Sequence, residues 1–169
     1  MVDLLSILNE DMGLENSNKQ IRRFEQRDFW MMSLPEHEKK LFNLIPNYEQ
    51  YLMDNTIRES SFTALINNKP IVCFGLIQLF PQVAEAWLIP SIDLRVSIKN
   101  AYAFQKATKK FFNNAFDIFD LRRIQVTIDE TNTISMAWIK TMGFTKEGCM
   151  REFGYNKSDY FMFSRLKGE

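Results

Sequence analysis

The sequence predicts an α/β (α+β) domain with about six or seven β-strands and helices between them. Segments such as 121–128 alternate apolar and polar residues, which is the pattern of a half-buried strand. Residues 98–118 instead carry apolar residues at helical spacing and predict the longest helix. In chain order we expect a strand, two helices, three strands, a helix, a strand, a helix and two strands. That alternation predicts one sheet covered by helices.

The amino-acid composition excludes several classes of function. The chain has 169 residues, of which 46% are hydrophobic and 14% aromatic, so we expect a folded core rather than disorder. Its 21 basic and 21 acidic residues cancel, so we expect neither nucleic acid nor an anionic membrane as a partner. No apolar run approaches the roughly 20 residues of a membrane span. We therefore expect a cytoplasmic protein, in the host cytoplasm if the chain is phage-encoded.

Two cysteines, Cys73 and Cys149, fall in predicted strands without the spacing of metal ligands. We expect both to be reduced, buried and structural, and we expect no metal site.

The first 18 residues predict a short amphipathic helix that ends near Gly13. Its apolar face consists of Leu4, Leu5, Leu8 and Met12. We interpret residues 1–18 as an extension before a single domain at 19–169. The helix either packs on the core or contacts a partner or a second copy, and its length does not distinguish these alternatives.

A strand that runs into a helix is predicted at 19–29, followed by a helical pair. The sequence Ser33-Leu-Pro-Glu36 has the form of a capping box, and Pro46 interrupts the helical spacing that continues beyond it. We therefore expect two helices rather than one. The single histidine, His37, lies beside two glutamates in the first turn, and we expect it to be solvated.

Three strands follow at 62–66, 70–80 and 83–89. Asn67-Asn68-Lys69 predicts a hairpin turn between the first two, because Asn tolerates positive φ. The strand 70–80 is apolar on both faces, as expected of a central strand. In the helix 98–118, a lysine-rich face opposes the apolar one and is either solvated or a partner surface.

The C-terminal part predicts a strand at 121–128, a helix capped near Asn132, and a last strand from Tyr160 to Leu166. Gly143 follows the helix, where positive φ is common.

Several motifs in this part resemble the GNAT N-acetyltransferases, above all the branch that acetylates protein N-termini. They are Asn132-x-x-Ser135, Gly143-Phe144, Glu147-Gly148, Arg151, Asp159 and Ser164-Arg165-Leu166. The resemblance implies the GNAT fold, a mixed, bent β-sheet flanked by helices on both faces. It also implies acetyl-CoA and an amine acceptor, such as a protein or peptide N-terminus, as substrates.

The resemblance assigns cofactor binding to the segment that enters the long helix. The family places the CoA pyrophosphate there on backbone N–H groups, in the pattern Gln or Arg, two residues, Gly, one residue, Gly or Ala. The segment here consists of Arg95, Val96, Ser97, Ile98, Lys99, Asn100 and Ala101. Ile98 replaces the first glycine, so the loop is degenerate. Arg95 and Lys99 either pair with phosphate or are ordinary charges at a helix entrance.

Further site residues follow from the same resemblance. Leu88 and Ile89, at the end of the preceding strand, and Asn132 and Ser135 are candidates for CoA contact. Asn132 and Ser135 are equally explained as a helix cap and a first-turn hydroxyl.

Glu85 is the candidate general base, since histone-type relatives carry a glutamate on this strand. A carboxylate between apolar neighbours can have its pKa raised toward neutrality. The alternative is a glutamate on the solvent side of an alternating strand. Many relatives also carry a tyrosine that protonates the leaving thiolate. Ile139 occupies that position here, which leaves Tyr102, Tyr155 and Tyr160 as substitutes.

A second resemblance involves Asn132-Thr133 and Lys140-Thr141-Met142-Gly143. These residues resemble the corresponding helix of short GNAT-like proteins of T7-like podophages, a group associated with virion assembly. Two hypotheses therefore remain, an acetyl-CoA-dependent N-acetyltransferase and a weakly active or inactive assembly protein of the same fold.

Overall fold

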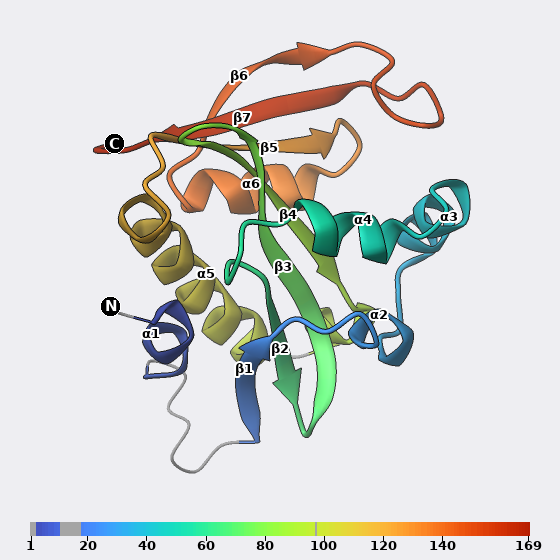
Figure 1. Cartoon of the computed structure of the whole chain (residues 1–169). Coiled ribbons are helices and arrows are strands. Elements are labelled where there is room, and N and C mark those ends of the chain that lie inside the picture. Colours follow the sequence, from blue (N-terminus) through green and yellow to red (C-terminus); the bar gives the residue numbers. More distant parts are fainter. Residues whose placement is uncertain (1–2, 11–17, 97) are drawn as a thin grey trace.

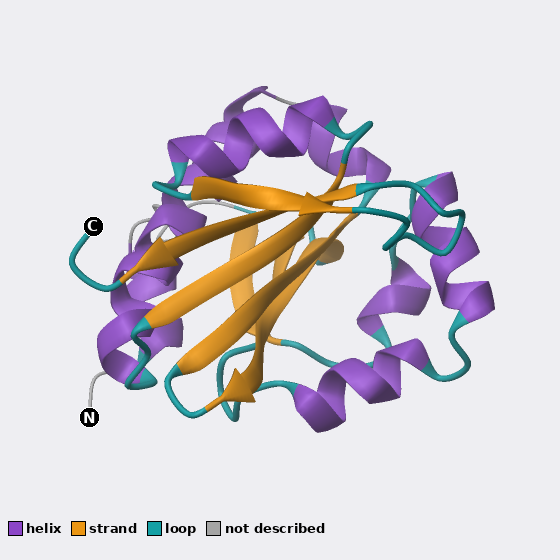
Figure 2. Cartoon of the chain, turned by 90° about the horizontal axis from the view of Figure 1, so that it is seen from above, coloured by secondary structure: helices purple, strands orange, loops and turns teal. Residues whose placement is uncertain are grey.

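A seven-stranded mixed β-sheet with helices on both faces forms the molecule (Figures 1 and 2). The computed structural model describes residues 3–10, 18–96 and 98–169; for 95, 96 and 98–101 it describes the backbone alone. The strands are β1 (Lys19–Arg23), β2 (Phe62–Ile66), β3 (Lys69–Phe80), β4 (Val83–Pro90), β5 (Arg123–Asp129), β6 (Thr145–Met150) and β7 (Tyr160–Leu166). The helices are α1 (Leu4–Glu10), α2 (Asp28–Met31), α3 (Glu36–Leu44), α4 (Tyr48–Asn55), α5 (Ile98–Ile118) and α6 (Thr133–Thr141), with a 3-10 helix η2 (Ile92–Val96).

The sheet has one parallel junction. The strand order is β1-β2-β3-β4-β5-β7-β6, and every neighbouring pair is antiparallel except β4 and β5. Those two strands pair at only three positions, Val83 to Glu85 with Arg123 to Gln125. Beyond Glu85 both strands continue without pairing to each other, so the sheet opens between them.

The two faces of the sheet carry separate hydrophobic clusters. The larger cluster lies under α1, α5 and α6 and includes Phe62, Phe111, Ile124 and Phe163. The smaller lies under α2 and α4 and includes Phe29, Leu52, Cys73, Trp87 and Ile89. Along β4, Ala84 therefore faces the larger cluster, whereas the alternate residues 85, 87 and 89 face the other side.

Most predicted elements are observed. The long helix spans Ile98–Ile118, and Pro46 separates α3 from α4. Asn67 and Asn68 form the predicted hairpin turn, with φ of 52° and 61°. Gly143 has a φ of 87°.

The helix α1 packs on the core. Leu4 and Leu8 are buried in the larger cluster. Met12 and Gly13, which were expected to complete this helix, lie outside the described residues.

Two predictions are wrong. Ser33 does not cap α3: Pro35 occupies the N-cap and no side chain caps this end. The Ser33 carbonyl instead accepts hydrogen bonds from Ile92 N (2.8 Å) and Ser91 Oγ (3.2 Å), which ties this loop to the end of β4. Cys149 is exposed, because β6 is an edge strand whose residues 145–149 all face solvent, while Cys73 is buried as expected.

No helix in the described part of the chain is both long and apolar enough to span a bilayer.

Candidate functional site

The predicted general base, Glu85, lies at the point where β4 and β5 part. Glu85 is the last β4 residue that pairs with β5, and it is half-buried. Its carboxylate accepts one hydrogen bond on each oxygen, from Thr127 Oγ1 to Oε1 (3.1 Å) and from Gln125 Nε2 to Oε2 (3.5 Å). Both donors lie on β5, so the two strands are joined by side chains where their backbone pairing ends.

The hydrogen bonds continue from Gln125 toward the sheet edge. Gln125 Oε1 accepts from Arg123 Nε (3.2 Å), and the Arg123 guanidinium binds Glu147 through two contacts of 2.8 and 2.6 Å. Ser164 Oγ donates to the same carboxylate (2.5 Å). Hydrogen bonds from Arg123 and Ser164 lower the pKa of Glu147 to about 2. This ion pair forms the outer end of a series of hydrogen-bonded side chains that extends across the strands of the sheet.

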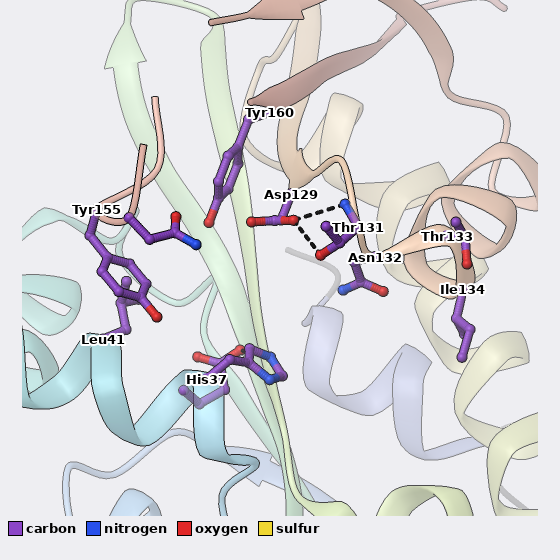
Figure 3. A pocket seen from close by; sticks show the side chains of 11 residues that line it. His37, Leu41, Asp129, Thr131, Asn132, Thr133, Ile134, Tyr155 and Tyr160 are labelled. Carbon is purple, nitrogen blue, oxygen red and sulfur yellow. Dashed lines mark hydrogen bonds and ion pairs between the residues drawn. The ribbon is translucent and has the colours of Figure 1, made fainter. Parts of the chain in front are cut away.

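A polar cleft of about 440 Å³ opens at the carboxyl end of β5 (Figure 3). In the close-up, Tyr155 and Tyr160 face His37 and Leu41 of α3 across it. The remaining lining residues are Glu38, Asp129, Thr131, Asn132, Thr133, Ile134 and Asn156. We call it the polar cleft.

A second, more apolar cavity of about 200 Å³ lies between the end of β4, α5 and α6. Its lining consists of Leu88, Pro90, Leu94, Phe104, Gln105, Ile134, Ser135 and Trp138. We call it the apolar slot. Ile134, which is 63% exposed, lines both the slot and the polar cleft, so the two cavities adjoin at this residue.

Burial and neighbouring groups shift the pKa values of titratable groups in and near the polar cleft. Burial acts to raise the pKa of Asp129, but hydrogen bonds from Thr131 and Ser158 outweigh it, so this pKa lies below its ordinary value. Burial, followed by the charge of Asp129, raises the pKa of Tyr160. Burial also raises the pKa of Tyr48, on α4, and the nearby Glu38 and Glu85 add to that rise. Both tyrosines therefore stay protonated at neutral pH.

No family model matches the chain. One curated relative, the uncharacterized N-acetyltransferase p20 of Bacillus licheniformis, is 33% identical over 67 residues. The match spans 38% of this chain and only 38% of that relative.

Solved structures match over almost the whole chain. The GNAT-family acetyltransferase from Bacillus anthracis superimposes with a TM-score of 0.66 at 17% identity, over 91% of this chain and 98% of that one. This chain has the GNAT fold. The ribosomal L7/L12 alpha-N-protein acetyltransferase RimL, in complex with coenzyme A, matches with a TM-score of 0.63 at 14% identity, over 89% and 95% of the two chains.

Within this GNAT fold, the predicted cofactor residues divide between the two cavities. Leu88 and Ser135 line the apolar slot, whereas Asn132 lines the polar cleft. The Asn132 side chain accepts a hydrogen bond from Ser135 N (3.1 Å), so it caps α6. Ile89 is buried in the smaller hydrophobic cluster, with its side chain on the opposite face from Leu88.

The predicted pyrophosphate segment is only partly described. Ser97 lies outside the described residues, as do the side chains of Arg95, Val96, Ile98, Lys99, Asn100 and Ala101. The backbone shows that η2 ends at Val96 and α5 begins at Ile98. The segment thus connects η2, which follows the end of β4, to the long helix.

The three tyrosines that are candidate proton donors do not all lie in one place. Tyr155 and Tyr160 line the polar cleft, whereas Tyr102 is 70% exposed on α5. Ile139, which replaces the usual tyrosine, is buried in the larger cluster. His37 is well exposed, as expected, yet it lines the cleft. Its Nε2 atom lies 3.4 Å from Glu38 Oε1.

Sequence reasoning missed the side chains around Glu85. Arg123, Gln125 and Thr127 occupy alternate positions of β5, with apolar residues between them. The period-two pattern identified the apolar face of this strand, but the same pattern also marks a polar face formed by an arginine, an amide and a hydroxyl. Among the described residues, no group of three or more His, Cys, Asp or Glu is placed to hold a metal ion.

Proposed function

We propose that the protein is an acetyl-CoA-dependent N-acetyltransferase, in which an amine attacks the acetyl thioester directly. One observation carries the proposal. The strands β4 and β5 part after Glu85, an apolar slot lies on the α5 and α6 side of the opening, and a polar cleft adjoins that slot at Ile134. Two substrates that enter from these two cavities would meet beside Ile134.

The residues present fit the cofactor's pantetheine arm. This arm is a narrow chain with amide groups, and the slot offers apolar walls such as Leu88 and Trp138 together with polar groups of Gln105 and Ser135. The entrance of α5 follows β4, so N–H groups at the start of this 21-residue helix would face the pyrophosphate. Arg95 and Lys99 would add positive charge there.

The transfer requires two proton movements. The amine nitrogen forms a bond to the acetyl carbon while the carbon–sulfur bond breaks, and the nitrogen loses a proton. Glu85 is the proposed acceptor of that proton, directly or through one water. The released thiolate takes up a proton, for which Tyr155 and Tyr160 are the candidate donors, because both line the cleft.

The proposed acceptor is the N-terminus of a protein or peptide. The cleft is lined by hydroxyl, amide and carboxylate groups from three separate segments, which suits a peptide backbone that needs several hydrogen bonds. The solved structure of RimL, an alpha-N-protein acetyltransferase, supports this choice at the level of the fold.

The test is an acceptor panel. Purified protein is incubated with acetyl-CoA and, separately, with peptides carrying a free N-terminus, the same peptides with a blocked N-terminus, spermidine, or no acceptor. Transfer is followed by mass spectrometry and by thiol release. We expect acetylation of the free N-termini alone. Acetylation of spermidine but not of peptides would contradict the peptide acceptor while retaining the N-acetyltransferase.

The second candidate is an assembly protein of the same fold with weak or no catalysis. It is favoured by Ile139, which cannot donate a proton, and by Ile98 in place of the loop glycine. In that case no acceptor would be modified, and acetyl-CoA at millimolar concentration would not bind.

A further inference from the structure

We infer that Thr127 and Gln125 are positioning residues for the Glu85 carboxylate, and that the Arg123–Glu147 ion pair orients Gln125 toward it. This inference rests on the proposed role of Glu85 as the base and names residues that set its geometry. It starts from the way the two carboxylate oxygens are bonded. Each accepts one hydrogen bond from β5, at 3.1 Å from Thr127 and 3.5 Å from Gln125.

Two donors on different oxygens restrict rotation of the carboxylate about its terminal bond. A glutamate side chain otherwise has a broad, poorly defined last torsion. Each carboxylate oxygen has two lone pairs, so one on each oxygen remains able to accept a proton. A base must lie within hydrogen-bond reach of the proton it removes, and a fixed carboxylate meets that requirement at a lower entropic cost.

The donor and acceptor ends of Gln125 are set by Arg123. A guanidinium donates hydrogen bonds and accepts none, so the Gln125 atom that faces Arg123 Nε must be its carbonyl oxygen. The Gln125 NH₂ group then points the other way, toward Glu85. With the amide reversed, its oxygen would face the carboxylate and repel it.

Arg123 is itself held in place from the sheet edge. Its two terminal nitrogens bind the two oxygens of Glu147, the bidentate geometry that only arginine can form. Ser164 donates to the same carboxylate. These hydrogen bonds therefore form a continuous series of side chains on the face opposite the larger hydrophobic cluster. The series runs from β7 and β6 through β5 to β4, by way of Ser164, Glu147, Arg123, Gln125 and Glu85.

The first arm of the test needs no activity. Side-chain amide resonances of Gln125 are recorded by ¹⁵N NMR in the whole protein, assigned with Gln125→Met, and compared with those of Glu85→Gln and Arg123→Lys. We expect both changes to shift the Gln125 resonances and to leave those of Gln50 unchanged. Gln50 is the matched control, because it makes the same type of bond to Asp54 (2.7 Å) on exposed α4. Gln125 resonances that shift in neither variant would overturn the inferred series of hydrogen-bonded side chains.

The second arm is kinetic and uses the acceptor that gives turnover in the panel. Thr127→Val should lower kcat roughly tenfold, since a hydrogen bond to a charged group is lost, with the KM for acetyl-CoA unchanged. Gln125→Met should have a smaller effect, because its contact is longer. Gln50→Met should have none.

A double-mutant cycle separates positioning from a structural role. If Thr127 acts through Glu85, then Thr127→Val has no further effect on kcat in a Glu85→Gln background. The same tenfold loss in both backgrounds would overturn the inference. Absence of turnover by the wild-type protein would instead contradict the proposed function, and the NMR arm would still decide whether the chain orients Glu85.

Discussion

Neighbouring residues on the same strands of this sheet face two different environments. On the α5 side, Ala84, Ile124 and Phe163 join a continuous apolar cluster, whereas the adjacent Glu85, Gln125 and Ser164 belong to a hydrogen-bonded chain on the other side. The period-two geometry of a strand makes this division possible. We call the α5 side the apolar face and interpret its larger cluster as the main source of stability. The other side, which we call the polar face, also carries the smaller hydrophobic cluster, and we interpret its hydrogen-bonded side chains as the support of the proposed base.

The largest expected effect tests the apolar face. Phe111 is 1% exposed and packs against Phe62, Phe74 and Phe112. Phe111→Ala should lower the free energy of unfolding by about 3–5 kcal/mol, because it removes buried surface and leaves a cavity. Urea unfolding measures this change.

The matched control is Phe80→Ala. Phe80 is 67% exposed at the end of β3, so the same substitution should change the unfolding free energy by less than about 0.5 kcal/mol. Equal losses at the two positions would contradict the assignment of stability to the buried larger cluster.

The next effect concerns the polar face and should appear in rate rather than stability. Glu85→Gln keeps the size of the side chain but removes the proposed base, so kcat should fall roughly a hundredfold. The KM for acetyl-CoA and the urea midpoint should stay close to those of the wild type. An unchanged kcat would remove Glu85 from the proposed base role.

The smallest effect depends on pH. The pKa of Glu147 is about 2 in the folded protein against an ordinary value of 4.5, so its ion pair stabilises the fold above pH 4.5 and this contribution disappears as pH falls from about 4.5 to about 2. The Glu147 side chain is 41% exposed, and solvent screening limits the gain to about 1 kcal/mol or less.

Urea unfolding of wild-type protein and Glu147→Gln at several pH values tests this expectation. The stability difference between them should be present at pH 6 and should vanish near pH 2. A difference that stays constant over this range would mean that the ion pair does not contribute.

Much of the fold was accessible from sequence because local rules and tertiary packing agree. Pro46 separates two helices, Asn67 and Asn68 adopt positive φ in a hairpin, and the long helix spans the predicted residues. The exceptions depended on long-range contacts. Ser33 does not cap a helix because its carbonyl is bound to the β4 end, and Cys149 is exposed because β6 lies at a sheet edge.

The candidate site was less accessible. Glu85 was predicted as the base from its type and position. Its hydrogen-bond partners lie 40 and 42 residues away and are brought to it only by the parallel pairing of β4 with β5. Asn132 and Ser135 were assigned together, yet the start of α6 points them into two different cavities. Spacing along one helix turn did not reveal that division.

The most direct test is calorimetric titration of the protein with acetyl-CoA, because the proposed transfer requires that the apolar slot binds the cofactor. We predict micromolar affinity for wild-type protein and a roughly tenfold or greater loss for Ser135→Trp, whose side chain would fill the slot. Thr145→Trp, on the exposed strand β6, should bind as the wild type does. No binding by the wild type at millimolar acetyl-CoA, or equal binding by Ser135→Trp, would contradict the account.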